Sequence, residues 1–155
     1  MTATHFSGPV QTGTKLEGET GGPNFGNVLL TQSTSITQNS TNAVSSTLYI
    51  PAGSRIVDIV VDVLTAFNSG TSATLSVGTA AAGTQYASGV DVKTATGRIR
   101  PTFTAAQLAA MNGVSVLGVS SPIAAPGPVV VTVTPSGATS AGYVVVTVVY
   151  AQQEA

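Results

Sequence analysis

The chain has 155 residues, of which 43% are hydrophobic and only 7% are charged, against a typical charged share of about 25%. Five Lys and Arg nearly balance six Asp and Glu, so no basic surface is available for nucleic acid or anionic lipid. Cysteine is absent and His5 is the only histidine, which excludes thiolate catalysis and argues against a zinc site. No cofactor or metal is expected. So little charge predicts either a neutral, hydroxyl-rich surface or one covered by identical neighbours.

The first 26 residues differ from the rest of the chain. They contain six glycines and two prolines and show no regular hydrophobic period, so they predict an extended N-terminal arm ahead of a β domain over residues 27–155. Their apolar residues are spaced as isolated anchors, which suits docking into grooves on a partner; an ordinary floppy terminus is the alternative. The arm lacks the features of a signal peptide, and no apolar run is long enough to span a membrane. We expect a soluble protein made in a cytoplasm.

Alternating side chains from residue 28 onward predict β structure. The clearest case is residues 56–64, IVDIVVDVL, whose odd positions are apolar and whose even positions include Asp58 and Asp62. Since successive strand residues point to opposite faces, one face is expected to be a wall of branched aliphatic side chains, formed by Val57, Ile59, Val61 and Val63. About eight short strands are expected in all. The nine segments with strand-like patterns are residues 28–38, 44–50, 56–67, 73–77, 90–93, 98–103, 114–119, 129–134 and 142–150.

Turn residues separate these strands. Residues 94–97 are expected to turn between two brief strands, and residues 135–141 (PSGATSA) to close a hairpin between the last two. One short helix is predicted over 104–111, with Thr104 as its N-cap and Asn112-Gly113 as its stop. The pattern as a whole predicts an all-β, antiparallel, jelly-roll-like sandwich. Its uncharged last strand must pair centrally or be covered in an oligomer, because an exposed edge there would aggregate.

No catalytic constellation is visible, so an enzyme is not expected. Asp58 and Asp62 lie about 13 Å apart along a strand, too far to share a proton. They are expected to solubilise the outer face, to pair with Arg55, Arg98 or Arg100, or to oppose mispairing between subunits. A serine nucleophile lacks a general base, because His5 lies in the arm. Arg98 and Arg100, with Lys93, form a positive cluster that suits either an acidic partner or a solvated strand face.

Three segments resemble the decoration, or cement, proteins of tailed-bacteriophage heads. They are THFSGPVQTG near the start, IPAGSRIVDIVVDVLTAFNSGTSATLSVGT in the centre and VTVTPSGATSAGYVVVTVVYAQ at the end. Together they cover most of the chain, and each is compositional rather than a sharp signature.

The resemblance implies a jelly-roll protein that binds the outside of an assembled phage head as a homo-oligomer, a trimer. It would clamp neighbouring capsomers, with the major capsid protein as its partner, and involve neither nucleic acid nor membrane. The arm would contact the capsid through Phe6, Pro9, Val10, Leu16 and Phe25. Contacts between copies would involve Tyr143, Val145, Arg98 and Arg100.

Two other functions stay open. One is a carbohydrate-binding or adhesive module of a phage tail or fibre, which requires a concave face with exposed aromatic side chains. The other is a small hydrolase using Asp58 and Asp62, which requires a bent geometry that brings the two carboxylates together.

Overall fold

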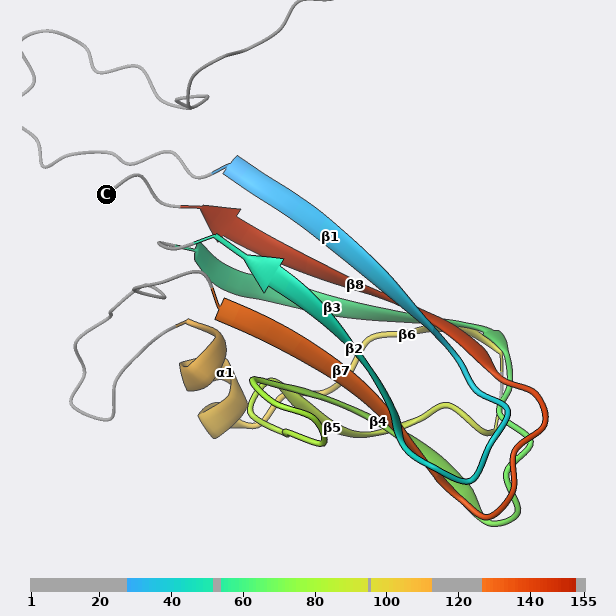
Figure 1. Ribbon diagram of the computed structural model, residues 1–155. Coiled ribbons are helices and arrows are strands. Elements are labelled where there is room, and N and C mark those ends of the chain that lie inside the picture. Colours follow the sequence, from blue (N-terminus) through green and yellow to red (C-terminus); the bar gives the residue numbers. More distant parts are fainter. Residues whose placement is uncertain (1–27, 52–53, 95, 113–126, 153–155) are drawn as a thin grey trace, which may run out of the picture.

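The computed structural model describes residues 28–51, 54–94, 96–112 and 127–152. Within these ranges the chain forms two four-stranded antiparallel sheets, packed face to face, and one short helix (Figure 1). Sheet A has the strand order β1 (Val28–Thr37), β8 (Tyr143–Gln152), β3 (Ser54–Thr65), β6 (Gly97–Ile99). Sheet B has the order β2 (Val44–Ile50), β7 (Gly127–Ser136), β4 (Ser72–Gly78), β5 (Ala87–Asp91).

The strand pairs are nested, which identifies a jelly roll. The first strand pairs with the eighth, the second with the seventh, the third with the sixth and the fourth with the fifth. The remaining pairings, β3 with β8 and β4 with β7, join these pairs into the two sheets. Eight strands in two sheets with this order form a double-sheet jelly roll. The predicted fold class is therefore confirmed.

The core lies between the sheets and is built mainly of aliphatic side chains. Strand β8 gives it Val144, Val146, Val148 and Tyr150, while β7 gives it Val129, Val131 and Val133, all buried. Phe67, just after β3, is the largest of the fully buried side chains. Alternation places every second residue of these strands inward, so the period-two pattern predicts the core of both central strands.

Strand β3 departs from the predicted alternation at two register shifts against β8, the second of which lies between Val63 and Thr65. Its register against β8 shifts between Ile56 and Asp58, where a β-bulge leaves Val57 without a partner. Val57 is consequently 46% exposed, and Ile56 is buried instead. The prediction that Val57 shares the apolar wall with Ile59, Val61 and Val63 is therefore wrong. The extra residue at the bulge shifts the alternation by one, so the residues before it point to the opposite face of the sheet from the one predicted.

Two predicted turns prove to be connections between sheets. Residues 137–142 join β7 in sheet B to β8 in sheet A, and residues 92–96 likewise join β5 to β6. The predicted hairpin at 135–141 is therefore wrong, because the strands on either side of it belong to different sheets. Strand β6 is also shorter than the predicted 98–103. The predicted strand over 114–119 and the arm over 1–26 lie outside the described residues.

The helix α1 (Ala105–Met111) begins with a capping box. The Thr104 hydroxyl accepts a hydrogen bond from the Gln107 backbone N–H (3.2 Å), and the Gln107 side chain accepts one from the Thr104 N–H (2.9 Å). Met111, at the other end of α1, is buried in the core. Packing and capping together hold a helix of two turns that would not form alone.

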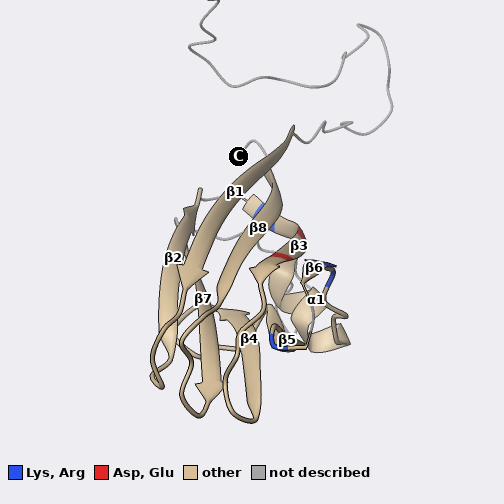
Figure 2. Cartoon of the chain, turned by 90° about the vertical axis from the view of Figure 1, so that its right-hand side faces the viewer, with Lys and Arg blue, Asp and Glu red and all other residues tan. Residues whose placement is uncertain are grey.

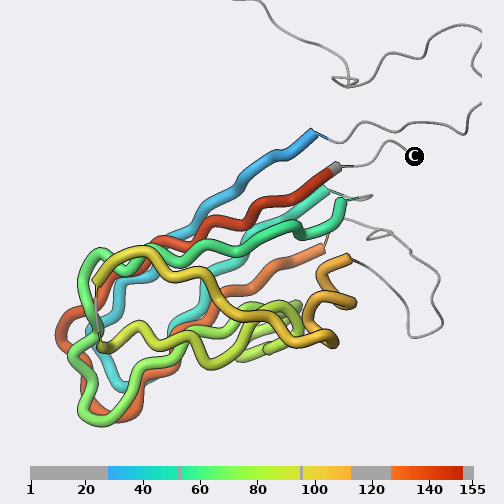
Figure 3. Tube along the Cα trace, turned by 180° about the vertical axis from the view of Figure 1, so that it is seen from behind, coloured from blue at the N-terminus to red at the C-terminus, as the bar shows by residue number. Residues whose placement is uncertain are grey.

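The two ends of the sandwich differ. Strand β1 begins where β8 ends and β3 begins, since Val28 and Ser54 both lie opposite Gln152. Figures 1 and 3 show that β2 ends and β7 begins at this same end, which we call the terminal end. The opposite end, the loop end, is tied by hydrogen bonds between connections. Asn68 there accepts from the backbone N–H of Ser140 (2.9 Å) and of Ala141 (3.1 Å).

Candidate interaction surfaces

Neither a cluster of potential metal ligands nor a membrane-spanning helix is found among the described residues. No three His, Cys, Asp or Glu side chains gather closely enough in this part of the chain to hold a metal ion. No helix among the described residues is long and apolar enough to cross a membrane. The surfaces that remain for function are the outer faces and the edges of the two sheets.

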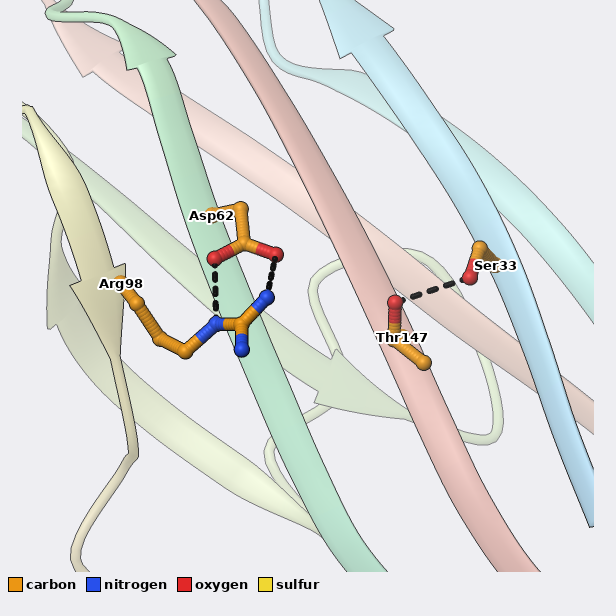
Figure 4. A network of polar contacts seen from close by, with 4 residues as sticks. All are labelled: Ser33, Asp62, Arg98 and Thr147. Atoms are coloured by element: carbon orange, nitrogen blue, oxygen red, sulfur yellow. Dashed lines mark hydrogen bonds and ion pairs between the residues drawn. The ribbon is translucent and has the colours of Figure 1, made fainter.

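The outer face of sheet A is built in three parts. Along β1 it carries hydroxyl side chains, and Ser33 hydrogen-bonds to Thr147 of β8 at 2.8 Å (Figure 4). Along β8 it carries the half-buried Tyr143, Val145 and Val149, which alternate with the inward-facing core valines. Along β3 and β6 it carries ion pairs. This face is thus an apolar strip with hydroxyls on one flank and charges on the other.

Two ion pairs cross from β3 to the segment containing β6. The Arg98 guanidinium donates to both carboxylate oxygens of Asp62, at 2.8 and 3.0 Å (Figure 4). Arg100 donates to Asp58 at 2.5 Å. The hydrogen bond from Arg98 lowers the pKa of the Asp62 carboxyl below its usual value, and the same contact raises the pKa of Arg98. The sequence-based prediction of arginine partners for these carboxylates is confirmed, with Arg98 and Arg100 as the partners.

The structure places the four residues predicted to contact other copies on or beside this face. Val145 lies opposite Asp62, which in turn lies opposite Arg98, so three strands form one cross-strand row. Both arginines project into solvent, but their charge is matched by aspartates rather than left for an acidic partner. A role for these residues in subunit contacts stays a prediction. The five predicted capsid-contact residues, Phe6, Pro9, Val10, Leu16 and Phe25, lie outside the described residues.

Charge is segregated to one part of the sandwich, a feature that the sequence did not reveal. The described charged residues are Arg55, Asp58, Asp62, Asp91, Lys93, Arg98 and Arg100. All lie on β3, β5, β6 or the segments next to them, and in Figure 2 no charged segment is coloured on β1 or β2. Strands β1, β2, β4, β7 and β8 carry no Lys, Arg, Asp or Glu. Locating this asymmetry requires knowing which strands are neighbours.

Most of the exposed large apolar side chains gather at the terminal end. Leu29 and Leu30 lie at the start of β1, Tyr49 at the end of β2 and Val57 at the bulge of β3. Leu29 is 62% and Tyr49 65% exposed. These four residues lie at the end of the sandwich where β1 begins.

A shallow depression of ≈ 490 Å³ lies beside β5 and β6. Its charged lining residues are Asp91, Arg98 and Arg100, and each already has a partner. Asp91 accepts hydrogen bonds from the Thr94 hydroxyl and the Lys93 N–H, which lower the pKa of its carboxyl. The depression therefore offers no free charged group to recognise a ligand.

Comparison with known proteins gives one informative structural match. No protein-family model matches the sequence, and no curated protein sequence matches it. The structure is similar to a chain solved as "Cyanophage Pam1 capsid asymmetric unit", with a TM-score of 0.56 and 17% sequence identity. The match covers 86% of this chain and 91% of that chain. The similarity therefore extends over nearly the whole of both chains, and at this identity it establishes a shared fold.

Proposed function

We propose that this chain is a structural, non-enzymatic virion protein that binds the outer surface of an assembled phage head. In this role a homotrimer contacts the major capsid protein and clamps neighbouring capsomers together. The carrying observation is the shared jelly-roll fold with a chain of a cyanophage capsid asymmetric unit, over 86% of this chain. The resemblance of three sequence segments to head decoration proteins points the same way.

The physical character of the sandwich supports a mechanical role. Its core runs the full length of two packed sheets, and its loop end is fastened by hydrogen bonds between successive connections. Such a body resists deformation, because interiors at close packing transmit strain rather than absorb it. The exposed apolar side chains at the terminal end lie where the arm begins, so arm and sandwich can contact a shell on the same side.

Clamping requires no catalysed reaction. It requires only that the protein bind the assembled shell more tightly than the free capsid subunits. A protein that binds the assembled shell but not its free subunits stabilises the shell by mass action. Many copies on one particle multiply a modest energy per site. A neutral protein also approaches a shell without strong electrostatic steering, so its binding should depend little on salt.

Shell binding by the full chain tests this proposal. We expect co-sedimentation with expanded heads of the cognate phage and a higher temperature of head disruption when the protein is bound. Deleting residues 1–26 should abolish binding and leave the sandwich folded. A triple Phe6→Ala, Val10→Ala, Leu16→Ala variant should weaken binding, whereas a matched Thr2→Ala, Thr4→Ala, Thr12→Ala control should not. Unchanged binding after the deletion would refute the role of the arm, and no binding by the intact chain would refute the function.

The carbohydrate-binding alternative makes a different prediction. It requires exposed aromatic side chains on a concave face, and among the described aromatic residues Tyr49 is the one that is largely exposed. Glycan-array binding in the absence of shell binding would favour that alternative over the capsid role.

A further inference from the structure

The two lateral sides of the sandwich are built very differently. One side is formed by the edge strands β1 and β2, which lie next to each other at the margins of sheets A and B. The Thr34 hydroxyl of β1 bonds to the Ser46 hydroxyl of β2 at 2.5 Å, which joins the two edges. We call this the β1–β2 side. The opposite side is formed by the edge strands β5 and β6.

The β5 and β6 edges carry the devices that keep sheet edges from pairing with other chains. Strand β6 has three residues and β5 has five, and the register between β4 and β5 is broken by an irregularity. Asp91, Lys93, Arg98 and Arg100 add charge on this side (Figure 2). Short strands, bulges and charges are the means by which exposed edges are protected. This side is therefore suited to solvent.

The β1–β2 side carries none of these devices. Strand β1 pairs with β8 over ten consecutive residues without a bulge, and β2 pairs with β7 over seven. Neither edge strand contains a charged residue or a proline. In the described residues the other edge of each strand has no strand partner. An edge that is long, regular and uncharged pairs readily with another chain.

We infer that the β1–β2 side is the surface through which copies of this chain associate with one another, edge to edge. A partner for this side must be uncharged and must offer free backbone N–H and C=O groups. The chain itself supplies such a surface. Strands β1 and β2 run in opposite directions (Figure 1), so β1 of one copy can pair antiparallel with β2 of the next, a heterologous contact that closes into a ring of three copies. This inference deepens the proposed homo-oligomer by naming its interface, while shell binding is measured separately.

The size of the β1–β2 side is adequate for a stable contact. Ten residues at strand rise span about 34 Å, and two stacked sheets with their outer side chains are about 20 Å thick. The side therefore presents roughly 700 Å² per copy, close to the ≈ 800 Å² that one partner buries in a standard interface. Leu29, Leu30 and Tyr49 lie on these two strands and give the surface an apolar component at the terminal end.

Placing lysine on each edge tests the inference. The variant pair is Thr31→Lys on β1 with Thr47→Lys on β2, both at exposed positions. The matched control is Thr65→Lys on β3 with Thr74→Lys on β4, which also puts one exposed lysine on each sheet but away from the β1–β2 side. Mass is measured on the full chain by light scattering coupled to size exclusion, and folding is verified by circular dichroism. We expect a multiple of 15.4 kDa for the wild type and the control, and the monomer mass for the edge variant.

Amide hydrogen exchange on the wild type supplies a second readout that does not need a variant. Every second residue of β1 has its N–H directed away from β8, and these amides exchange slowly only if something covers them. We expect slow exchange in the oligomer and fast exchange in the monomeric edge variant.

Several outcomes would overturn the inference. The inference would be wrong if the wild type were monomeric at all concentrations. It would also be wrong if the edge variant kept the wild-type mass, or if the control substitutions dissociated the oligomer and the edge substitutions did not. The protein could also be monomeric and still show slow exchange of the β1 edge amides. If deleting residues 1–26 then made that exchange fast, the chain's own arm, and not a second copy, would cover this side. A monomer whose shell binding is abolished by the edge lysines would assign the side to the capsid protein instead.

Discussion

Replacing Gly142 with alanine should destabilise the sandwich through one contact. An ideal Cβ on Gly142 would lie 2.3 Å from Cδ1 of Phe67 and 2.6 Å from both Cε1 and Cγ. Phe67 is 1% exposed, so its ring has no solvent to move into. The Gly142 carbonyl also accepts a hydrogen bond from the Gln38 N–H at 3.1 Å, which holds the backbone in place. Overpacking of this kind costs about 1–3 kcal/mol.

The matched control is Gly70→Ala at the same end of the sandwich. A Cβ there would have its nearest neighbour, the Ser136 carbonyl oxygen, at 3.6 Å, which is ordinary contact. Both substitutions reduce the conformational entropy of the unfolded chain by a similar amount, which raises the free energy of unfolding by about 0.4–1 kcal/mol. The difference between the two variants therefore isolates the contact with Phe67. We expect Gly70→Ala to be neutral or slightly stabilising.

Urea titration at fixed protein concentration measures these free energies of unfolding, since an oligomer's stability depends on concentration. The steric contact between residue 142 and Phe67 also predicts that substitutions at these two positions are energetically coupled. In a double-mutant cycle, Phe67→Leu should relieve part of the cost of Gly142→Ala, with a coupling of about 0.5–3 kcal/mol. Equal stability of the two glycine variants, or a coupling near zero, would refute the steric argument.

Three further predictions concern the helix cap, an ion pair and the core. Thr104→Ala removes the hydroxyl that caps α1 and should lower the free energy of unfolding by about 1 kcal/mol; Thr102→Ala, exposed and just before the cap, is the control for urea titration. The pKa of Asp62 is lowered in the folded state, so the unfolded chain binds more protons and stability should fall as the pH drops below about 4. Asp62→Asn should flatten that fall between pH 5 and pH 2, and an unchanged profile would contradict the pairing. Leu75→Ala, at a fully buried position, should cost about 2–5 kcal/mol, whereas Leu64→Ala at a 58% exposed position should cost about 0.5 kcal/mol or less.

The strands were largely predictable from the sequence because alternation is a local property. Valines alternate inward along β8, and the predicted bounds of β2 coincide with the observed Val44–Ile50. The exception at Val57 has a physical cause, because a bulge inserts one residue without changing the composition around it. A strand prediction from residue types alone sees a good β-former at that position and has no signal for the bulge.

Sheet membership was not predictable in the same way. The segment PSGATSA has the residues of a hairpin turn, and the same residues also suit a connection that crosses from one sheet to the other. The choice is settled by distant contacts, namely the pairing of β7 with β2 and β4 and of β8 with β1 and β3. For the same reason, Arg98 and Arg100 were identified as partners for Asp58 and Asp62 without a reason to prefer them over Arg55.

The position of β8 determines which strand forms the free edge of sheet A. Its sequence, YVVVTVVYAQ, has no charge, proline or glycine and would aggregate as an edge strand. The jelly-roll order places it between β1 and β3, which satisfies both of its edges. In that arrangement the free edge of sheet A is β1. The β1 side chains on the solvent face of the sheet, apart from Leu29, all carry hydroxyls: Thr31, Ser33, Ser35 and Thr37. The inferred contact between copies requires an edge that tolerates water until the copies meet and can then pair with a strand. The hydroxyl side chains of β1 meet the first requirement and its regular backbone meets the second.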